Sequence, residues 1–141
     1  MRTDKRMATI LVVDDNVAVA RVLGRLLQQK GHRALTAGDG PTALQFARDE
    51  HPDLILLDMM MPEMDGLEVL RRLKADPVTA DPPVILFSAV DDPKMVAAAM
   101  RQGAREYWVK ASFNFDELPR RLARHLPPPQ TTDEPVTNGR S

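Results

Sequence analysis

The sequence lacks cysteine, an excess of charge of either sign, and any apolar run longer than a strand. Without cysteine, disulfides and thiolate metal sites are excluded. A formal net charge of −1 makes neither nucleic acid nor an anionic membrane an obvious partner for the whole surface. The apolar runs are too short to span a bilayer, and the charged start Met1–Arg6 is unlike a signal peptide. We therefore expect a cytoplasmic protein.

What is present suffices for one folded domain. The 141 residues are 43% hydrophobic and 28% charged, values ordinary for a soluble domain with a real core. We predict a domain over residues 9–126, preceded by an N-terminal extension of residues 1–8. Residues 127–141 begin with three prolines and lack apolar periodicity, so we interpret them as a disordered tail or a linker.

Five apolar segments alternate with five segments of helical spacing. The predicted strands are residues 9–13, 33–37, 53–58, 84–87 and 105–109. The predicted helices are residues 17–30, 40–50, 67–74, 93–101 and 116–126. Nearly continuous apolar strands separated by amphipathic helices are typical of a parallel sheet covered on both faces. The pattern predicts the α/β class, with a doubly wound five-stranded parallel sheet.

Polar residues lie at the ends of four of these strands. Asp14 and Asp15 follow the first strand, Asp58 ends the third, Ser88 follows the fourth and Lys110 follows the fifth. Ligands of such sheets bind beyond the carboxyl ends of the strands. We therefore expect these five side chains to converge at one edge of the sheet.

This set of side chains has a definite chemistry. Three carboxylates close together repel one another unless a cation shares the site, and Mg²⁺ prefers oxygen ligands of this kind. An aspartate can attack phosphorus to form an acyl phosphate, and an ammonium and a hydroxyl can hold the transferred oxygens. No His or Cys follows a strand, so a hydrolytic triad has no members here.

Each residue also has an ordinary structural interpretation when it is taken alone. Asp14 and Asp15 could cap the helix after them, and Asp58 could begin a turn. Ser88 could be a loop hydroxyl and Lys110 a solvated charge. Because all five occur at strand ends, we favour a shared acidic site over five separate coincidences.

Four segments together resemble the receiver domain of bacterial response regulators, over residues 9–126. They are Ile10–Asn16, Leu56–Gly66, Ile85–Ala89 and Glu106–Lys110. The resemblance implies the flavodoxin-like strand order 2-1-3-4-5 and the role of a signalling switch. It also implies a phosphohistidine on a histidine kinase or phosphotransfer protein as the phosphoryl donor.

The resemblance further implies a role for individual residues. Asp58 corresponds to the phosphoacceptor, and Asp14 and Asp15 to the acidic pair that holds Mg²⁺, for which Mn²⁺ is a possible substitute. The backbone carbonyl of Met60 corresponds to a further metal ligand. Ser88 and Lys110 correspond to the residues that hold the phosphoryl group. The expected switch residues are Ser88 and Tyr107, which remodel the surface made by the fourth helix, fifth strand and fifth helix, where a target protein or a second copy would bind.

Residues on either side of the expected site bear on its chemistry. The family usually has proline after the lysine, joined by a cis bond, whereas this chain has Ala111. A cis bond before a residue other than proline costs about 2.5–4 kcal/mol, so either the fold enforces that strain or the bond is trans; we favour cis. Met60 and Val90 flank the site, and as apolar groups they should slow hydrolysis of an acyl phosphate.

Two other functions compete with the switch. One is a Mg²⁺-dependent aspartyl phosphohydrolase or phosphomutase, but such enzymes usually need a cap, for which this chain has no spare residues. The other is a receiver-like interaction module that is never phosphorylated, and the Lys110-Ala111 step is its only support. The sequence shows no DNA-binding or catalytic output domain, so it specifies neither the kinase, the target nor the biological process, and it leaves open a longer parent protein.

Overall fold

The computed structural model describes residues 8–127 of the chain. The strands are β1 (Thr9–Val13), β2 (Arg33–Ala37), β3 (Leu54–Leu57), β4 (Val84–Ser88) and β5 (Glu106–Val109). The helices are α1 (Val17–Gln29), α2 (Gly40–Glu50), α3 (Gly66–Ala75), α4 (Pro93–Arg101) and α5 (Leu118–Ala123). Two 3₁₀ turns, η1 (Lys110–Ser112) and η2 (Phe115–Glu117), lie between β5 and α5. The predictions for residues 1–8 and 127–141 fall, apart from Ala8 and Pro127, outside the described residues.

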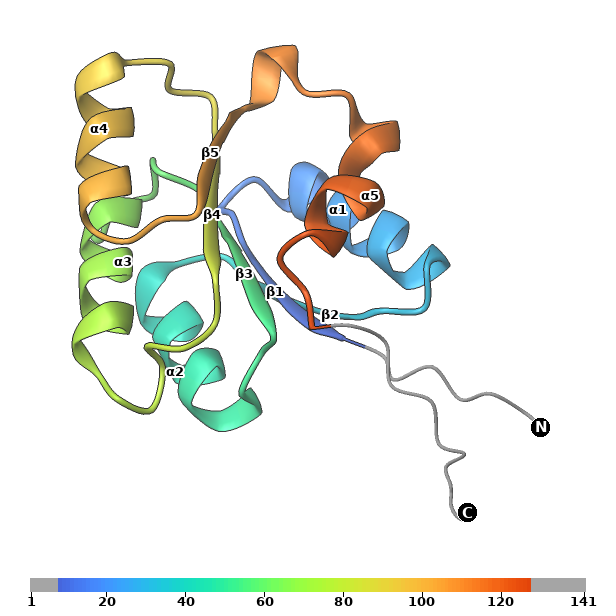
Figure 1. Ribbon diagram of the computed structural model, residues 1–141, viewed down its shortest axis with the longest axis horizontal. Coiled ribbons are helices and arrows are strands. Elements are labelled where there is room, and N and C mark those ends of the chain that lie inside the picture. The colour runs from blue at the N-terminus through green and yellow to red at the C-terminus, as the bar shows by residue number, and fades with distance from the viewer. Residues whose placement is uncertain (1–7, 128–141) are drawn as a thin grey trace.

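All five strands pair in parallel, in the order β2-β1-β3-β4-β5, which confirms the predicted topology (Figure 1). The register of the strands aligns their carboxyl ends. Val13 of β1 pairs with Leu57 of β3, and Ser88 of β4 pairs with Val109 of β5. The residues after these pairs therefore emerge side by side at the carboxyl edge of the sheet.

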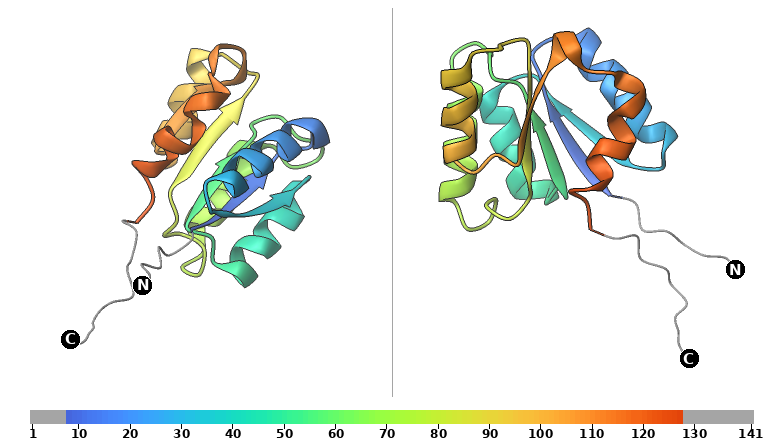
Figure 2. Two further views of the ribbon diagram at one scale, coloured as in Figure 1. Left: turned by 90° about the vertical axis from the view of Figure 1, so that its right-hand side faces the viewer. Right: turned by 45° about the horizontal axis from the view of Figure 1, so that its top comes forward.

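Helices cover both faces of the sheet, as predicted (Figure 2). Buried residues of α2, α3 and α4, among them Ala43, Val69 and Ala99, pack on one face. Leu23 of α1 and Leu122 of α5 pack on the other. The strands are buried between these layers because both of their faces are apolar. Within residues 8–127, no helix has both the length and the apolar character needed to cross a membrane.

The last helix is where the prediction was wrong. The other nine elements lie within one residue of their predicted ends. The helix expected over residues 116–126 is instead the turn η2 and then α5, which ends at Ala123. Leu118 and Leu122 are fully buried at helical spacing, but Phe113 and Phe115 join the core on the same face from non-α backbone. The 3₁₀ turn η2 therefore takes the place of the first two residues of the expected helix, and the α-helix ends three residues before its expected end.

Candidate functional site

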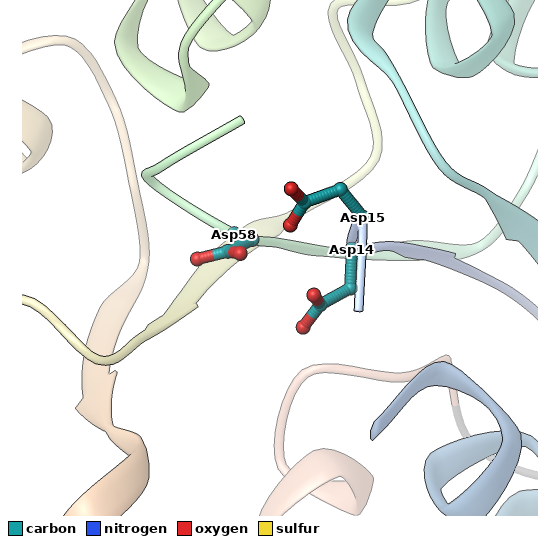
Figure 3. A group of neighbouring side chains, drawn as sticks. All are labelled: Asp14, Asp15 and Asp58. Carbon is teal, nitrogen blue, oxygen red and sulfur yellow. The ribbon is translucent and has the colours of Figure 1, made fainter. Parts of the chain in front are cut away.

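The carboxyl edge of the sheet gathers three aspartates. Asp14 and Asp58 come directly after the paired residues Val13 and Leu57, and the Asp58 N–H donates to the Val13 carbonyl at 2.9 Å. One carboxylate oxygen from each of Asp14, Asp15 and Asp58 lies within 4.8 Å of the others. Figure 3 shows these side chains gathered where β1 and β3 end. Asp14 and Asp58 are only 4% and 5% exposed, whereas Asp15 is exposed.

Capping does not explain this arrangement. The residue that caps α1 is Asn16, whose side chain accepts from the Val19 N–H at 3.2 Å. The cap of α3 is Asp65, seven positions beyond Asp58 in the sequence. The aspartates at the ends of β1 and β3 therefore cap neither helix, and oxygen ligands of this kind suit a hard divalent cation. Asp14, Asp15 and Asp58 are the residues that could hold one.

Lys110 supplies the cation nearest to this cluster. Its Nζ donates to Asp14 Oδ2 at 2.7 Å and lies 3.6 Å from Asp58 Oδ2. The Lys110–Ala111 peptide bond is trans, so the expectation of a cis bond was wrong. Without proline the cis bond carries its full cost, and the trans chain turns into η1 while the lysine still reaches the carboxylates.

The charge balance around Asp58 is unfavourable for an ionised carboxylate. Burial raises the pKa of Asp58, the Asp14 carboxylate raises it further, and the Lys110 ammonium only partly opposes them. A backbone N–H from Met60 adds little, because it lies 3.4 Å from Asp58 Oδ1. The Lys110 ammonium thus pairs with two of the three carboxylates, and the site fits a group that brings positive charge.

Ser88 and Tyr107 meet at the loop after β4. Ser88 is fully buried, and its Oγ accepts the Val90 N–H at 3.1 Å. The Tyr107 hydroxyl donates to the Val90 carbonyl at 2.7 Å, and burial raises the pKa of this tyrosine. The two predicted switch residues therefore hold the same residue of this loop, one through its N–H and the other through its carbonyl.

Met60 and Val90 flank the cluster unequally. The Met60 side chain is 55% exposed, whereas Val90 is half-buried. Within the described chain, the Met60 carbonyl accepts no hydrogen bond from protein, so it is free to meet a ligand. A shielding role of these two side chains stays a prediction.

Sequence reasoning missed two residues that shape the site. Gly66 lies so close to β3 that a Cβ there would meet the Asp58 carbonyl oxygen at 2.4 Å. The Phe87 ring lies near the lysine, with its centroid 5.8 Å from Lys110 Nζ. A glycine at the start of a helix and an aromatic residue before Ser88 were signals available in the sequence.

Comparisons with known proteins agree with this geometry. The family described as the response regulator receiver domain matches residues 10–123. The response regulator PleD of Caulobacter vibrioides is 46% identical over 103 residues, which make up 73% of this chain and 23% of PleD. The DNA-binding response regulator MtrA of Mycobacterium tuberculosis is 36% identical over 133 residues, 94% of this chain and 56% of MtrA. This chain thus spans about half or less of these relatives.

A solved structure shows the same fold. The chemotaxis protein CheY4 of Vibrio cholerae superimposes with a TM-score of 0.79 at 30% identity. The superposition covers 86% of this chain and all of that one. The likeness therefore extends over nearly all of the described residues.

Proposed function

The chain belongs to the response regulator receiver family, and from that premise we propose that it accepts a phosphoryl group on Asp58. The donor is a phosphohistidine on a histidine kinase or a phosphotransfer protein. The observation that carries this proposal is the underpaired Asp58 carboxylate, buried beside Asp14 and within reach of Lys110. Burial limits the access of water to the carboxylate, which lies at the carboxyl edge of the sheet.

In the transfer, an Asp58 oxygen forms the new O–P bond while the N–P bond of the donor breaks. The histidine leaves with the electron pair of that bond and takes up a proton. Lys110, which already lies between Asp14 and Asp58, pairs with the phosphoryl oxygens. The three aspartates and the Met60 carbonyl would hold Mg²⁺ or Mn²⁺, which would supply positive charge beside those oxygens.

The switch arises because the Val90 N–H and the new phosphoryl group would compete for the position of the Ser88 side chain. Its Oγ now accepts the Val90 N–H, and the new phosphoryl oxygens would draw its hydroxyl away. The Val90 loop is also held by Tyr107, so the two movements are coupled. Phosphorylation would thereby shift the population towards a packing with a different α4–β5–α5 surface.

The proposed output is binding rather than turnover. The protein would catalyse only its own phosphorylation and dephosphorylation, and its α4–β5–α5 surface would bind a target protein or a second copy. Some relatives are named as DNA-binding or transcriptional regulators, but we propose no direct contact with nucleic acid by this chain. A cytoplasmic location is part of the same proposal.

The test is phosphorylation by acetyl phosphate with Mg²⁺, and then measurement of the intact mass. The wild type should gain one phosphoryl group, and Asp58→Asn should gain none. Asp91→Asn is a matched control, because Asp91 is exposed in the loop after β4 and should not alter the gain. Addition of EDTA should abolish it. Phosphorylation of Asp58→Asn to the wild-type level would refute the assignment.

A further inference from the structure

The segment that follows Lys110 has little backbone attachment to the rest of the fold, whereas Lys110 itself directly follows β5. Residues 111–117 contain η2 and part of η1, and their hydrogen bonds are local. Phe113 N–H donates to the Lys110 carbonyl at a long 3.3 Å, and Glu117 N–H donates to the Asn114 carbonyl at 3.0 Å. Something other than the backbone must therefore hold this segment in place.

Four rings provide that attachment: Phe87, Trp108, Phe113 and Phe115, here called the aromatic cluster. Phe87 and Phe113 each contact the other three rings, and of these two Phe113 is the one that lies in the segment after Lys110. It stacks on Trp108 at 4.9 Å and 18°, and it meets Phe87 edge-on at 5.1 Å. Its contact with Phe115 is also edge-on, at 5.7 Å. Such pairs stabilise beyond the area that they bury.

The aromatic cluster is linked to the site at one end and to α5 at the other. Lys110 Nζ lies 5.8 Å from the Phe87 centroid, within the range of a cation–π contact. Phe87 directly precedes Ser88 on β4. On the far side, the Arg121 guanidinium lies 5.3 Å from the Phe113 ring. Phe113 is therefore held on both sides, three positions after the lysine.

We propose that Phe113 is a positioning residue for phosphoryl transfer, acting through Lys110. A lysine side chain has many rotamers, and the trans bond to Ala111 adds no local rigidity of the kind that proline supplies. Phe113 fixes the backbone from which the ammonium reaches Asp14 and Asp58. This inference rests on the proposed function, because the effect of Phe113 is on the rate of that transfer.

The first test compares phosphorylation rates with acetyl phosphate and Mg²⁺. Phe113→Ala should slow the transfer about tenfold, since small misplacement of a charged group is costly. Phe113→Tyr keeps the ring and should retain a rate near that of the wild type. Phe46→Ala is the matched control, because Phe46 is a half-buried phenylalanine of α2 on the opposite face of the sheet. It should leave the rate unchanged.

A double-mutant cycle separates positioning from general loss of structure. If Phe113 acts through Lys110, adding Phe113→Ala to Lys110→Ala should cause no further loss of rate. Fully additive losses would overturn the proposal. So would a wild-type rate in Phe113→Ala.

Amide hydrogen exchange keeps this inference distinct from the proposed function. Phe113→Ala should speed exchange in residues 110–117 while β1 and β3 keep their protection, whereas Phe46→Ala should not change that segment. If wild type takes up no phosphoryl group, the proposed function fails, and faster exchange still shows that Phe113 anchors the lysine segment. If exchange in residues 110–117 does not change, the anchor itself is refuted.

Discussion

Asp58, which is buried, and Glu106, which is half-buried, are two carboxylates whose pKa values move in opposite directions. Asp58 shares the Lys110 ammonium with Asp14, and burial raises the pKa of Asp58. Burial also acts to raise the pKa of Glu106, but hydrogen bonding to Trp108 and His125 outweighs it and lowers the value. Trp108 Nε1 donates to Glu106 at 2.7 Å, and His125 Nε2 lies 2.5 Å from its other oxygen.

The difference separates a carboxylate that is fully paired from one that is underpaired. Glu106 is surrounded by donors, including Arg121 at 3.5 Å, so it has little capacity left for a ligand. Asp58 is short of positive charge, which supports the proposal that it binds a cation and accepts a phosphoryl group. We expect substitutions at the two places to change stability in opposite directions.

The largest effect should come from the backbone that brings Asp58 to the sheet edge. Gly66→Ala would place a Cβ 2.4 Å from the Asp58 carbonyl oxygen and 2.8 Å from Met59 Cα. These are backbone atoms that cannot move aside cheaply, so we expect a loss of about 3 kcal/mol in the free energy of unfolding. Urea denaturation monitored by circular dichroism measures it.

Gly24→Ala is the matched control for this prediction. A Cβ at Gly24, inside α1, would meet only Ala34 Cβ, at an ordinary 3.9 Å. It should stabilise the protein by about 0.5–1 kcal/mol, because alanine is the better helix former. Equal effects from the two substitutions would show that the contact with Asp58 is not tight.

The strand ends were predictable from the sequence for a simple reason. Apolar runs such as Leu54–Leu57 mark buried parallel strands, and parallel strands end at the same edge, so the approach of Asp14, Asp58 and Lys110 results from topology. The roles assigned to these residues stay proposals.

The segment after β5 was not predictable in the same way. The sequence predicted one continuous helix over residues 116–126. No period in the sequence reveals that the Phe113 and Phe115 rings pack on Phe87, or that the Lys110–Ala111 bond is trans. Those features depend on contacts between distant parts of the chain, which override local preference.

The next effect in size concerns Glu106. Glu106→Gln removes the charge that binds Trp108, Arg121 and His125, so we expect a loss of about 1–2 kcal/mol at pH 7, reduced by partial exposure of the side chain. Because the folded-state pKa is lowered, the stabilisation is present above the ordinary value of 4.5 and is lost as pH falls through the folded value. Urea titrations at several pH values measure both. A loss independent of pH would contradict the ionic role.

Asp58→Asn should change stability in the direction opposite to Glu106→Gln. Without divalent cation it should stabilise the protein by about 0.5–2 kcal/mol at pH 7, as when a strained functional site is relieved. The folded-state pKa is raised, so the ionised carboxylate costs stability above it, and the advantage of asparagine should fade as pH falls toward 3.8.

Thermal unfolding with and without Mg²⁺ tests whether Asp58→Asn stabilises the protein. Mg²⁺ should raise the melting temperature of the wild type more than that of Asp58→Asn, because a ligand stabilises the state that binds it. If Asp58→Asn is the less stable protein without Mg²⁺ at pH 7, Asp58 is not underpaired.

The smallest change in stability should come from the loop between Asp58 and α3. This loop also distinguishes the Asp58 region from the Glu106 region. Within residues 8–127, His51 and Glu63 are the non-glycine residues with positive φ, and neither lies near Glu106 in the sequence. Glu63, at φ 70°, is the centre of a three-residue turn in which Met64 N–H donates to the Pro62 carbonyl at 2.7 Å. This backbone is strained for a residue with a side chain.

Glu63→Gly should relieve that strain, although glycine also adds entropy to the unfolded chain. The net result should be an increase of about 0.5 kcal/mol in the free energy of unfolding. Gln28→Gly, at an exposed position of α1, should instead lower the free energy of unfolding by about 1 kcal/mol, because glycine there only weakens a helix. Urea denaturation of both variants and the wild type measures the direction in which each substitution changes the free energy of unfolding. Equal losses would mean that the turn after Asp58 stores no strain, and the contrast with the Glu106 region would then rest on charge alone.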